Sequence, residues 1–280
     1  MIFIPDQTDS DTALMTDIFV HPDRVPPRFR PLKAWSHMQK LLRDKEDTEQ
    51  VFHIIEALNG RALVSNFEAF AESARGQVLL ERKEYLPPLL DDHSWIRELP
   101  EGTVGRAYVD FMEREGLTAQ GLVDESDKFR SQIRDYDDDL QWYGNRLRDT
   151  HDLFHVLTGY GRDALGEACL LGFSYSQNRG RGVIFIAFMA ARRMAKALPK
   201  SAHVMDCLWE GKRNGRMALP IIREDILSLL REPLEDARKR LSIQRPEAYL
   251  NALKICREAG IASEDIRPGA EPANPAQAAA

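Results

Sequence analysis

Apolar residues recur along this chain with the spacing of an α-helix, and this spacing constrains the fold more than any other sequence feature. The clearest case follows Thr103, a residue type that often caps the start of a helix. The next apolar residues fall at i, i+3, i+4, i+7 and i+8, on one helical face: Val104, Ala107, Tyr108, Phe111 and Met112. Strand-type alternation is scarce, although the run 182–186 fits either a strand or a buried helix. We therefore predict an all-α fold.

The same periodicity predicts helices over residues 32–42 and 49–58. A longer helix is predicted from an apolar line that continues toward residue 155: Ile133, Tyr136, Leu140, Tyr143 and Leu147. Residues 221–241 are predicted to form another helix, broken or kinked at Pro233, because proline has no amide hydrogen to donate.

The two ends of the chain differ from its middle. Residues 1–30 contain four prolines and no sustained periodicity, so we predict a flexible N-terminal arm. Residues 266–280 are rich in proline and alanine and have too little apolar surface to pack, so we predict a disordered tail. Between them no linker or repeat interrupts the pattern, and we predict one helical domain over residues 31–265.

Composition narrows the class of protein. The chain has 280 residues, of which 43% are hydrophobic and 29% charged, with a formal net charge of −6. A general nucleic-acid binder normally has an excess of basic residues, so we expect no nucleic-acid partner. Three cysteines without CxxC spacing indicate a reducing compartment. No apolar stretch approaches the roughly 18 residues of a membrane span, and no signal or transit peptide is evident, so we expect a cytoplasmic, bacterial-type protein.

The chemistry is concentrated around two histidines. If the helix through Leu140 continues at about 100° per residue, His151 and His155 fall within about 60° of its apolar line. Both imidazoles then point inward, one turn apart, at the spacing with which two histidines can share a metal ion. Asp152 lies at the edge of the same face.

A carboxylate on the next helix completes this set. Gly159 and Gly161 are expected to end the first helix, and a second helix begins near residue 163 with Glu167 on an apolar face. Two nitrogens and two carboxylates, from His151, Asp152, His155 and Glu167, suit zinc, and also iron or manganese. A hydrogen-bonded core network is the alternative, and spacing alone favours neither.

Three other features have simpler interpretations. His203 and Cys207 are expected to be a packed histidine beside a buried thiol rather than a second metal site. The aspartates of residues 135–139 are expected to face water. Residues 183–198 fit a core helix, and also a helix at the membrane surface or along a prenyl channel.

The residues around the histidines resemble a known family. His151-Asp152-Leu-Phe-His155, followed after eleven residues by Glu167, resembles the signature of the ubiquinone (coenzyme Q) biosynthesis family Coq4. The segment from Leu99 to Tyr108 is similar to that family's L-P-E-G-S/T-x-G-x-x-Y motif. The similarity covers about residues 31–245. One departure is Ser174, where many members have glutamate.

The resemblance implies a helical fold and a divalent metal, most simply zinc, on His151, Asp152, His155 and Glu167. It implies a polyprenylated aromatic substrate and removal of the C1 carboxyl from a polyprenylated 4-hydroxy-3-methoxybenzoate, in a simple form or an oxidative one that leaves a C1 hydroxyl. Asp152 is the expected catalytic residue, because a carboxylate beside the metal can transfer a proton.

Two other classes of function stay open at this point. A non-catalytic lipid-binding scaffold would use the metal only structurally, and a closed set of four ligands would favour it. A His-Asp phosphohydrolase would need further ligands, for which His203 is the one downstream candidate. The partners we expect are the membrane surface, bound peripherally at the bacterial inner membrane, other ubiquinone-biosynthesis enzymes, and a second copy of the chain.

Overall fold

The computed structural model describes residues 17–25, 28–43, 48–130, 135–263 and 266. Within these residues the chain is mostly helical and forms no strand, which confirms the all-α prediction; an isolated bridge joins Thr103 to Pro233. The α-helices are α1 (Pro31–Arg43), α2 (Thr48–Asn59), α3 (Ala62–Ala71), α4 (Ala74–Arg82), α5 (Leu86–Asp91), α6 (His93–Arg97), α7 (Val104–Glu115), α8 (Ala119–Arg130), α9 (Asp139–Asp149), α10 (His151–Thr158), α11 (Ala164–Asn178), α12 (Arg181–Ala197), α13 (Val204–Met217), α14 (Ile226–Arg231), α15 (Leu234–Arg240) and α16 (Glu247–Glu258). Two short 3-10 helices are η1 (Lys200–Ala202) and η2 (Ile221–Arg223).

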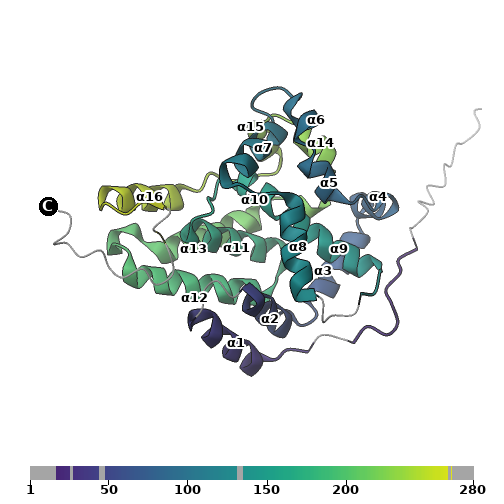
Figure 1. The fold of residues 1–280 in the computed structure, drawn as a ribbon, viewed down its shortest axis with the longest axis horizontal. Helices are drawn as coiled ribbons and strands as arrows, with labels where there is room; N and C mark the ends of the chain where they lie inside the picture. Colours follow the sequence, from purple (N-terminus) through teal and green to yellow (C-terminus); the bar gives the residue numbers. More distant parts are fainter. Residues whose placement is uncertain (1–16, 26–27, 44–47, 131–134, 264–265, 267–280) are drawn as a thin grey trace, which may run out of the picture.

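The core is built around α11, which packs along both α12 and α13 (Figure 1). The largest cluster of buried side chains combines residues of α7, α10, α11, α13, α14 and α16. A second cluster joins α3, α4 and α9, and a third joins α1 and α2 to α12. The candidate ligands on α10 and α11 therefore lie on helices that the main core holds in place.

Several predicted helices form with small changes in their ends. α1 and α2 match the predicted 32–42 and 49–58, and Thr103 caps α7 by accepting a hydrogen bond from the Arg106 amide. Residues 182–186 belong to α12 and are helical. Ala187, Ala191 and Met194 of α12 are buried, so the interpretation of this segment as a core helix is confirmed for that face.

The long helix predicted to lead into the histidines is wrong in two respects. Tyr136 precedes α9, which begins only at Asp139, and Ile133 lies outside the described residues. Thr150 then separates α9 from α10. Its hydroxyl donates a hydrogen bond to the Arg146 carbonyl at 2.8 Å, and its backbone amide donates to the same carbonyl. A threonine that bonds back to the preceding turn bends a helix, yet the inward faces of α9 and α10 persist.

The predicted helix over 221–241 is also wrong, because this region forms three short elements, η2, α14 and α15. Asp225 caps α14 by accepting a hydrogen bond from the Ser228 amide at 2.9 Å. Pro233 precedes α15, as its break-forming chemistry predicts.

The described part of the N-terminal arm, residues 17–25 and 28–30, is irregular as expected, but it is attached to α9. The His21 amide and the Arg24 guanidinium donate to the Asp138 carboxylate, and the Phe19 amide donates to Asp139. Asp138 and Asp139 are therefore buried, and the expectation that they face water is wrong for these two residues.

Most residues of the two chain termini lie outside the described residues. Residues 1–16 of the predicted arm and 267–280 of the predicted tail are not among the described residues. Ile266, which we had placed in the tail, is buried, and its carbonyl accepts a hydrogen bond from the Ala164 amide. Among the described helices, none has the length and apolar character that crossing a membrane requires.

Candidate metal centre

Two helix ends and the loop between them place the candidate ligands. His151 and His155 lie one turn apart on α10, which ends at Gly159 with a φ of +77°, a left-handed conformation that glycine adopts without strain. Glu167 lies in the first turn of α11, whose cap, Asp163, accepts hydrogen bonds from the Leu165 and Gly166 amides. The loop 159–163 thus sets the distance between the histidines and the carboxylate.

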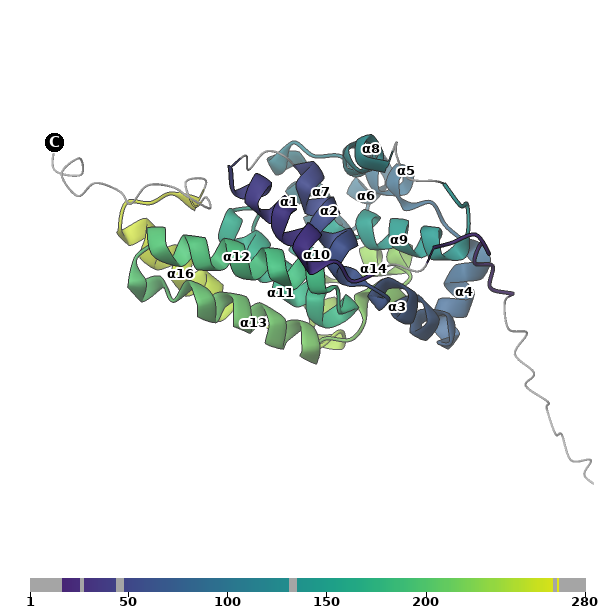
Figure 2. The same cartoon turned by 90° about the horizontal axis from the view of Figure 1, so that it is seen from below.

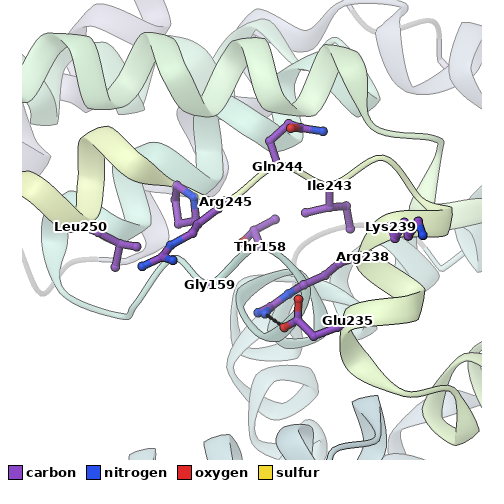
Figure 3. A pocket seen from close by; sticks show the side chains of 10 residues that line it. Thr158, Gly159, Glu235, Arg238, Lys239, Ile243, Gln244, Arg245 and Leu250 are labelled. Carbon is purple, nitrogen blue, oxygen red and sulfur yellow. Dashed lines mark hydrogen bonds and ion pairs between the residues drawn. The ribbon is translucent and has the colours of Figure 1, made fainter.

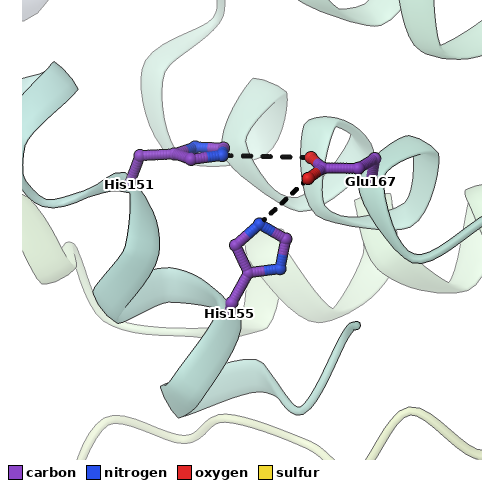
Figure 4. Close-up of side chains that lie close together, drawn as sticks. All are labelled: His151, His155 and Glu167. Carbon is purple, nitrogen blue, oxygen red and sulfur yellow. Dashed lines mark ion pairs between the residues drawn. The ribbon is translucent and has the colours of Figure 1, made fainter. Parts of the chain in front are cut away.

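The structure brings His151, His155 and Glu167 together. Each offers one ligand atom, and these atoms lie within 4.8 Å of one another. His155 Nε2 is 3.4 Å from one Glu167 oxygen and His151 Nε2 is 3.9 Å from the other (Figure 4). Two ligands about 2.0–2.1 Å from a zinc ion at a tetrahedral angle are about 3.3 Å apart, so the group fits a metal after small movements.

His155 is oriented as a metal ligand. Its Nδ1 donates a hydrogen bond to the Tyr160 carbonyl at 2.9 Å, which fixes the tautomer of the neutral ring and, in that form, leaves Nε2 without a hydrogen. That Nε2 atom is buried and has no hydrogen-bond partner among the described residues. A ligating histidine normally donates its other nitrogen to a carbonyl or carboxylate. A cation between this Nε2 and Glu167 would give the nitrogen the partner it lacks.

The charges of Glu167 and His151 suit the same conclusion. Burial alone would raise the pKa of Glu167, but the neighbouring His155, 3.4 Å away, and the charges of His151 and Arg162 lower it overall. Burial lowers the pKa of His151, which favours its neutral, ligating form. Burial also opposes charge on His155, yet Glu167 outweighs it and raises the pKa of His155. His155 is enclosed, whereas about a third of His151 and Glu167 is exposed.

Asp152 does not join the close group of ligand atoms. It is buried on α10, next to His151 along the chain, and its charge acts on both histidines. Burial, and then the Asp152 carboxylate, raise the pKa of the Tyr108 hydroxyl. Asp152 therefore belongs to the surroundings of the three-residue site rather than to its closest ligands.

A small cavity adjoins His155. Its volume is about 210 Å³, and it is lined by Ala107, Phe111, Arg114, His155, Val156, Gly159, Tyr160, Gly161 and Leu234. The ring of Phe111 stacks on His155 with centroids 5.4 Å apart. The Arg114 guanidinium also lies over the Phe111 ring, 5.4 Å from its centroid. A cavity of about 150 Å³ can hold a benzene molecule, so this space can accept a substituted aromatic ring.

A larger depression of about 500 Å³ lies beyond Gly159, which lines both spaces. Figure 3 shows its lining, in which polar and apolar groups contribute equally: Thr158, Gly159, Glu235, Arg238, Lys239, Ile243, Gln244, Arg245, Pro246 and Leu250. Arg238 donates to the Val156 and Leu157 carbonyls at the end of α10 and pairs with Glu235. Arg238 therefore links the wall of this depression to α10. The charged side chains of the lining make it unsuited to a polyprenyl tail.

Sequence reasoning missed several neighbours of the site. Tyr160 contributes only its backbone carbonyl, so its side chain gave no signal. Arg162, whose Nε is 3.8 Å from Glu167, and Phe111 lie close to the ligands only in the folded chain. The other histidine considered, His203, is exposed rather than packed, while Cys207 is buried as expected.

Comparison with known proteins identifies the family. The model of the family described as "Coenzyme Q (ubiquinone) biosynthesis protein Coq4" matches residues 32–247. The mitochondrial ubiquinone biosynthesis protein COQ4 of Scheffersomyces stipitis is 28% identical over 184 residues, 64% of this chain and 53% of that protein. The mitochondrial coq-4 protein of Neurospora crassa is 28% identical over 180 residues, 64% of this chain and 49% of that protein. The chain thus spans about half the length of these relatives.

A solved structure agrees in fold. A crystal structure from Nostoc punctiforme, described as that of a ubiquinone biosynthesis protein, superposes with a TM-score of 0.58 at 18% identity. The superposition covers 77% of this chain and 99% of the other. Since the family model covers most of the helical domain, including all three candidate ligands, this chain belongs to the coenzyme Q (ubiquinone) biosynthesis protein family Coq4.

Proposed function

We propose that this chain is a metal-dependent decarboxylase of ubiquinone biosynthesis, which removes the C1 carboxyl of a polyprenylated 4-hydroxy-3-methoxybenzoate. The observation that supports it best is the buried, partnerless Nε2 of His155, aimed at Glu167. Three protein ligands leave one position of a tetrahedral metal open, as catalytic zinc sites do. Two imidazoles and one carboxylate make zinc the first candidate, with iron or manganese next.

The chemistry divides between the ion and the chain. A bound divalent metal would supply Lewis-acid polarisation of the substrate's carboxylate or phenol oxygen. In our proposal Asp152 delivers a proton to ring carbon C1, and the phenol para to it releases its proton to solvent, which gives a dienone. The bond to the carboxylate then breaks, its electron pair restores the aromatic ring, and carbon dioxide leaves. The oxidative form, which leaves a hydroxyl on C1, removes two electrons from the substrate and requires dioxygen as the oxidant, which is reduced to hydrogen peroxide while water supplies the hydroxyl oxygen.

The setting of the reaction is part of the proposal. The cavity beside His155 is large enough for the aromatic ring, and Phe111 is one of the residues that line it. A polyprenyl tail resides in the membrane, so the protein would work as a peripheral protein on the inner membrane of a bacterium. Other ubiquinone-biosynthesis enzymes, and a second copy of the chain, are the proposed protein partners.

The variant Asp152→Asn tests the proposal, because it keeps the size of the side chain but cannot deliver a proton. We expect cells that have only this variant to accumulate the carboxylated prenyl-hydroxybenzoate, while the purified variant retains its metal and its melting temperature. The matched control is Asp206→Asn on α13, whose carboxylate is exposed. Mass spectrometry of the product distinguishes hydrogen from hydroxyl at C1.

Normal ubiquinone without accumulated acid in the Asp152→Asn cells would contradict the enzymatic role. It would support the scaffold, in which His151, His155 and Glu167 hold a structural ion. Glu167→Gln serves as a second variant, because it should lose both the metal and the reaction under the enzymatic proposal.

A further inference from the structure

The helix α1 has one face that no other described part of the chain covers. Ala34 and Met38 are buried in the cluster that α1 shares with α2 and α12. The opposite stripe is exposed, and we call it the outward face of α1: Leu32, Trp35, Ser36, Gln39, Lys40 and Arg43. Figure 2, which views the molecule from below, shows α1 on the near side.

The outward face is apolar at its start and basic at its end. Leu32 is 85% exposed and Trp35 47% exposed, and Phe29, just before the helix, is 54% exposed. Large apolar side chains gathered on an exposed surface indicate an interaction site more often than isolated ones do. The residues toward the end of the stripe, Lys40 and Arg43, are cationic.

The charge of this region is opposite to that of the whole chain. Between Asp23 and Asp44 there is no acidic residue, whereas six basic ones occur: Arg24, Arg28, Arg30, Lys33, Lys40 and Arg43. The net charge of the chain is −6. A strongly basic, apolar stretch in an acidic protein therefore marks a surface with a different partner from the rest.

Some of these cations are already used inside the fold. Arg24 pairs with Asp138, while Arg30 and Lys33 pair with Glu56 on α2. Arg28, Lys40 and Arg43 form no ion pair with any residue that the structure describes, so their charge is available to a partner.

We propose that the outward face of α1 docks this protein on a bilayer that contains anionic phospholipid. Tryptophan and leucine side chains insert at the boundary between headgroups and acyl chains, and lysine and arginine are attracted to acidic headgroups. A second copy of the chain fits this face poorly, because a two-fold contact would bring the same cations against each other. The surface is independent of the metal ligands and goes beyond the reaction proposed above.

Contacts with α12 hold α1, and therefore its outward face, in a fixed position on the helical domain. The Arg193 guanidinium on α12 donates to the Leu42 carbonyl at the end of α1, and Arg181 lies over the Phe29 ring before its start. α1 packs on α2, which in turn packs on α12, and α12 on α11, the helix of Glu167. Docking through α1 would therefore orient the whole helical domain on the membrane.

Vesicle flotation with the full-length protein tests the electrostatic part. We expect binding to vesicles of phosphatidylcholine with phosphatidylglycerol, little binding to phosphatidylcholine alone, and release by salt. The double variant Lys40→Gln with Arg43→Gln should bind on the order of 30-fold more weakly, since each charge near the surface contributes about fivefold. The matched control removes two exposed cations from α16, Lys254→Gln with Arg257→Gln, and should bind as the unmodified protein does.

Fluorescence quenching by brominated phospholipid tests the apolar part. Trp35 should enter the quenched depth, so the variant Trp35→Phe should lose the lipid-dependent component of the quenching. The double variant Leu32→Ser with Trp35→Ser should bind weakly, and the exposed apolar pair Met217→Ser with Leu219→Ser is its control.

Several results would overturn the inference. One is an equal loss of vesicle binding in the α1 variants and in the control variants. Another is a vesicle-bound protein in which Trp35 is not quenched. A third is binding to an acidic protein without any binding to anionic vesicles. The test measures binding without substrate, so a loss of decarboxylation in a protein that still binds vesicles would count only against the proposed reaction.

Discussion

Tyr249 on α16 donates its phenolic hydroxyl to the Asp163 carboxylate, across 86 positions of sequence, and accepts a hydrogen bond from the Gly161 amide at 3.0 Å. Asp163 caps the helix of Glu167, and Gly161 follows Tyr160, whose carbonyl orients His155. One hydroxyl therefore joins the middle and the end of the loop 159–163, which separates the candidate metal ligands. Removal of this hydroxyl should loosen the site without touching a ligand.

We expect Tyr249→Phe to weaken zinc binding about tenfold, which is the scale of losses when a partner that orients metal ligands is removed. It should also lower the free energy of unfolding by about 1–3 kcal/mol, because the partly buried Gly161 amide loses its acceptor. Competition with a fluorescent chelator measures the affinity, and Tyr175→Phe on α11 is the control. Unchanged affinity in Tyr249→Phe would show that the loop is fixed by other contacts.

The metal ligands themselves can be tested by metal content. The purified protein should hold about one divalent ion per chain. His155→Ala should hold almost none, because it removes the buried one of the three candidate ligands. His151→Ala, which removes a more exposed side chain, should lose the ion with less disturbance of the core. His203→Ala is the control, since His203 is exposed and outside the group.

The same proteins should differ in their response to added zinc. An ion that binds only the folded state raises the melting temperature, so zinc should stabilise the unmodified protein and His203→Ala but neither ligand variant. Full metal occupancy in both His155→Ala and His151→Ala would refute the site.

Gly166 lets α11 approach the loop closely. A β-carbon at this position would lie 2.2 Å from the Gly161 carbonyl oxygen, far inside contact distance. We expect Gly166→Ala to lower the free energy of unfolding by about 1–3 kcal/mol, as overpacking does, and to weaken metal binding because Glu167 moves. Chemical denaturation measures the first effect and chelator competition the second. Gly121→Ala on α8, where a β-carbon would meet only the Thr118 hydroxyl at 3.0 Å, should be nearly neutral or slightly stabilising.

The contact between the N-terminal arm and α9 should depend on pH. Burial opposes the charge of Asp138, but hydrogen bonds from Arg24, the His21 amide and the Gln141 amide outweigh it and lower its pKa to about 2. The unfolded-state value is near 3.8, so the charged carboxylate stabilises the fold above pH 4. This contribution, about 2 kcal/mol, is lost as the pH falls from about 4 to 2.

Urea denaturation of the unmodified protein and of Asp138→Asn checks this prediction. The difference between their free energies of unfolding should be largest near neutral pH and should shrink as the pH falls below 4. Asp137→Asn, which changes an exposed neighbour, should show little difference at any pH. A pH-independent difference for Asp138→Asn would contradict the proposed ionic contribution.

Local sequence predicted the parts of the site that depend on one helix. The four-residue spacing of His151 and His155 places them on one face whether or not a bend occurs nearby, and the structure keeps them together. The bend at Thr150 was not predicted, because a threonine inside a helical pattern either bonds back to its own helix or faces solvent. Two observations linked Glu167 to the histidines: its position on the apolar face of the second helix and the family resemblance. How closely Glu167 approaches the histidines depends on the loop 159–163.

The remaining features were decided by contacts between distant segments. The aspartates of residues 135–139 look alike in sequence, yet Asp138 and Asp139 are buried because residues 19–24 of the arm cover them. The hydroxyl of Tyr249 meets Asp163 only because α16 packs on α11 and α13. The sequence by itself determined the helical class and the pair of histidines on one face of α10, since periodicity acts over a few turns. Only the tertiary structure decided which loops, caps and charges surround that pair, because such contacts depend on how whole helices pack.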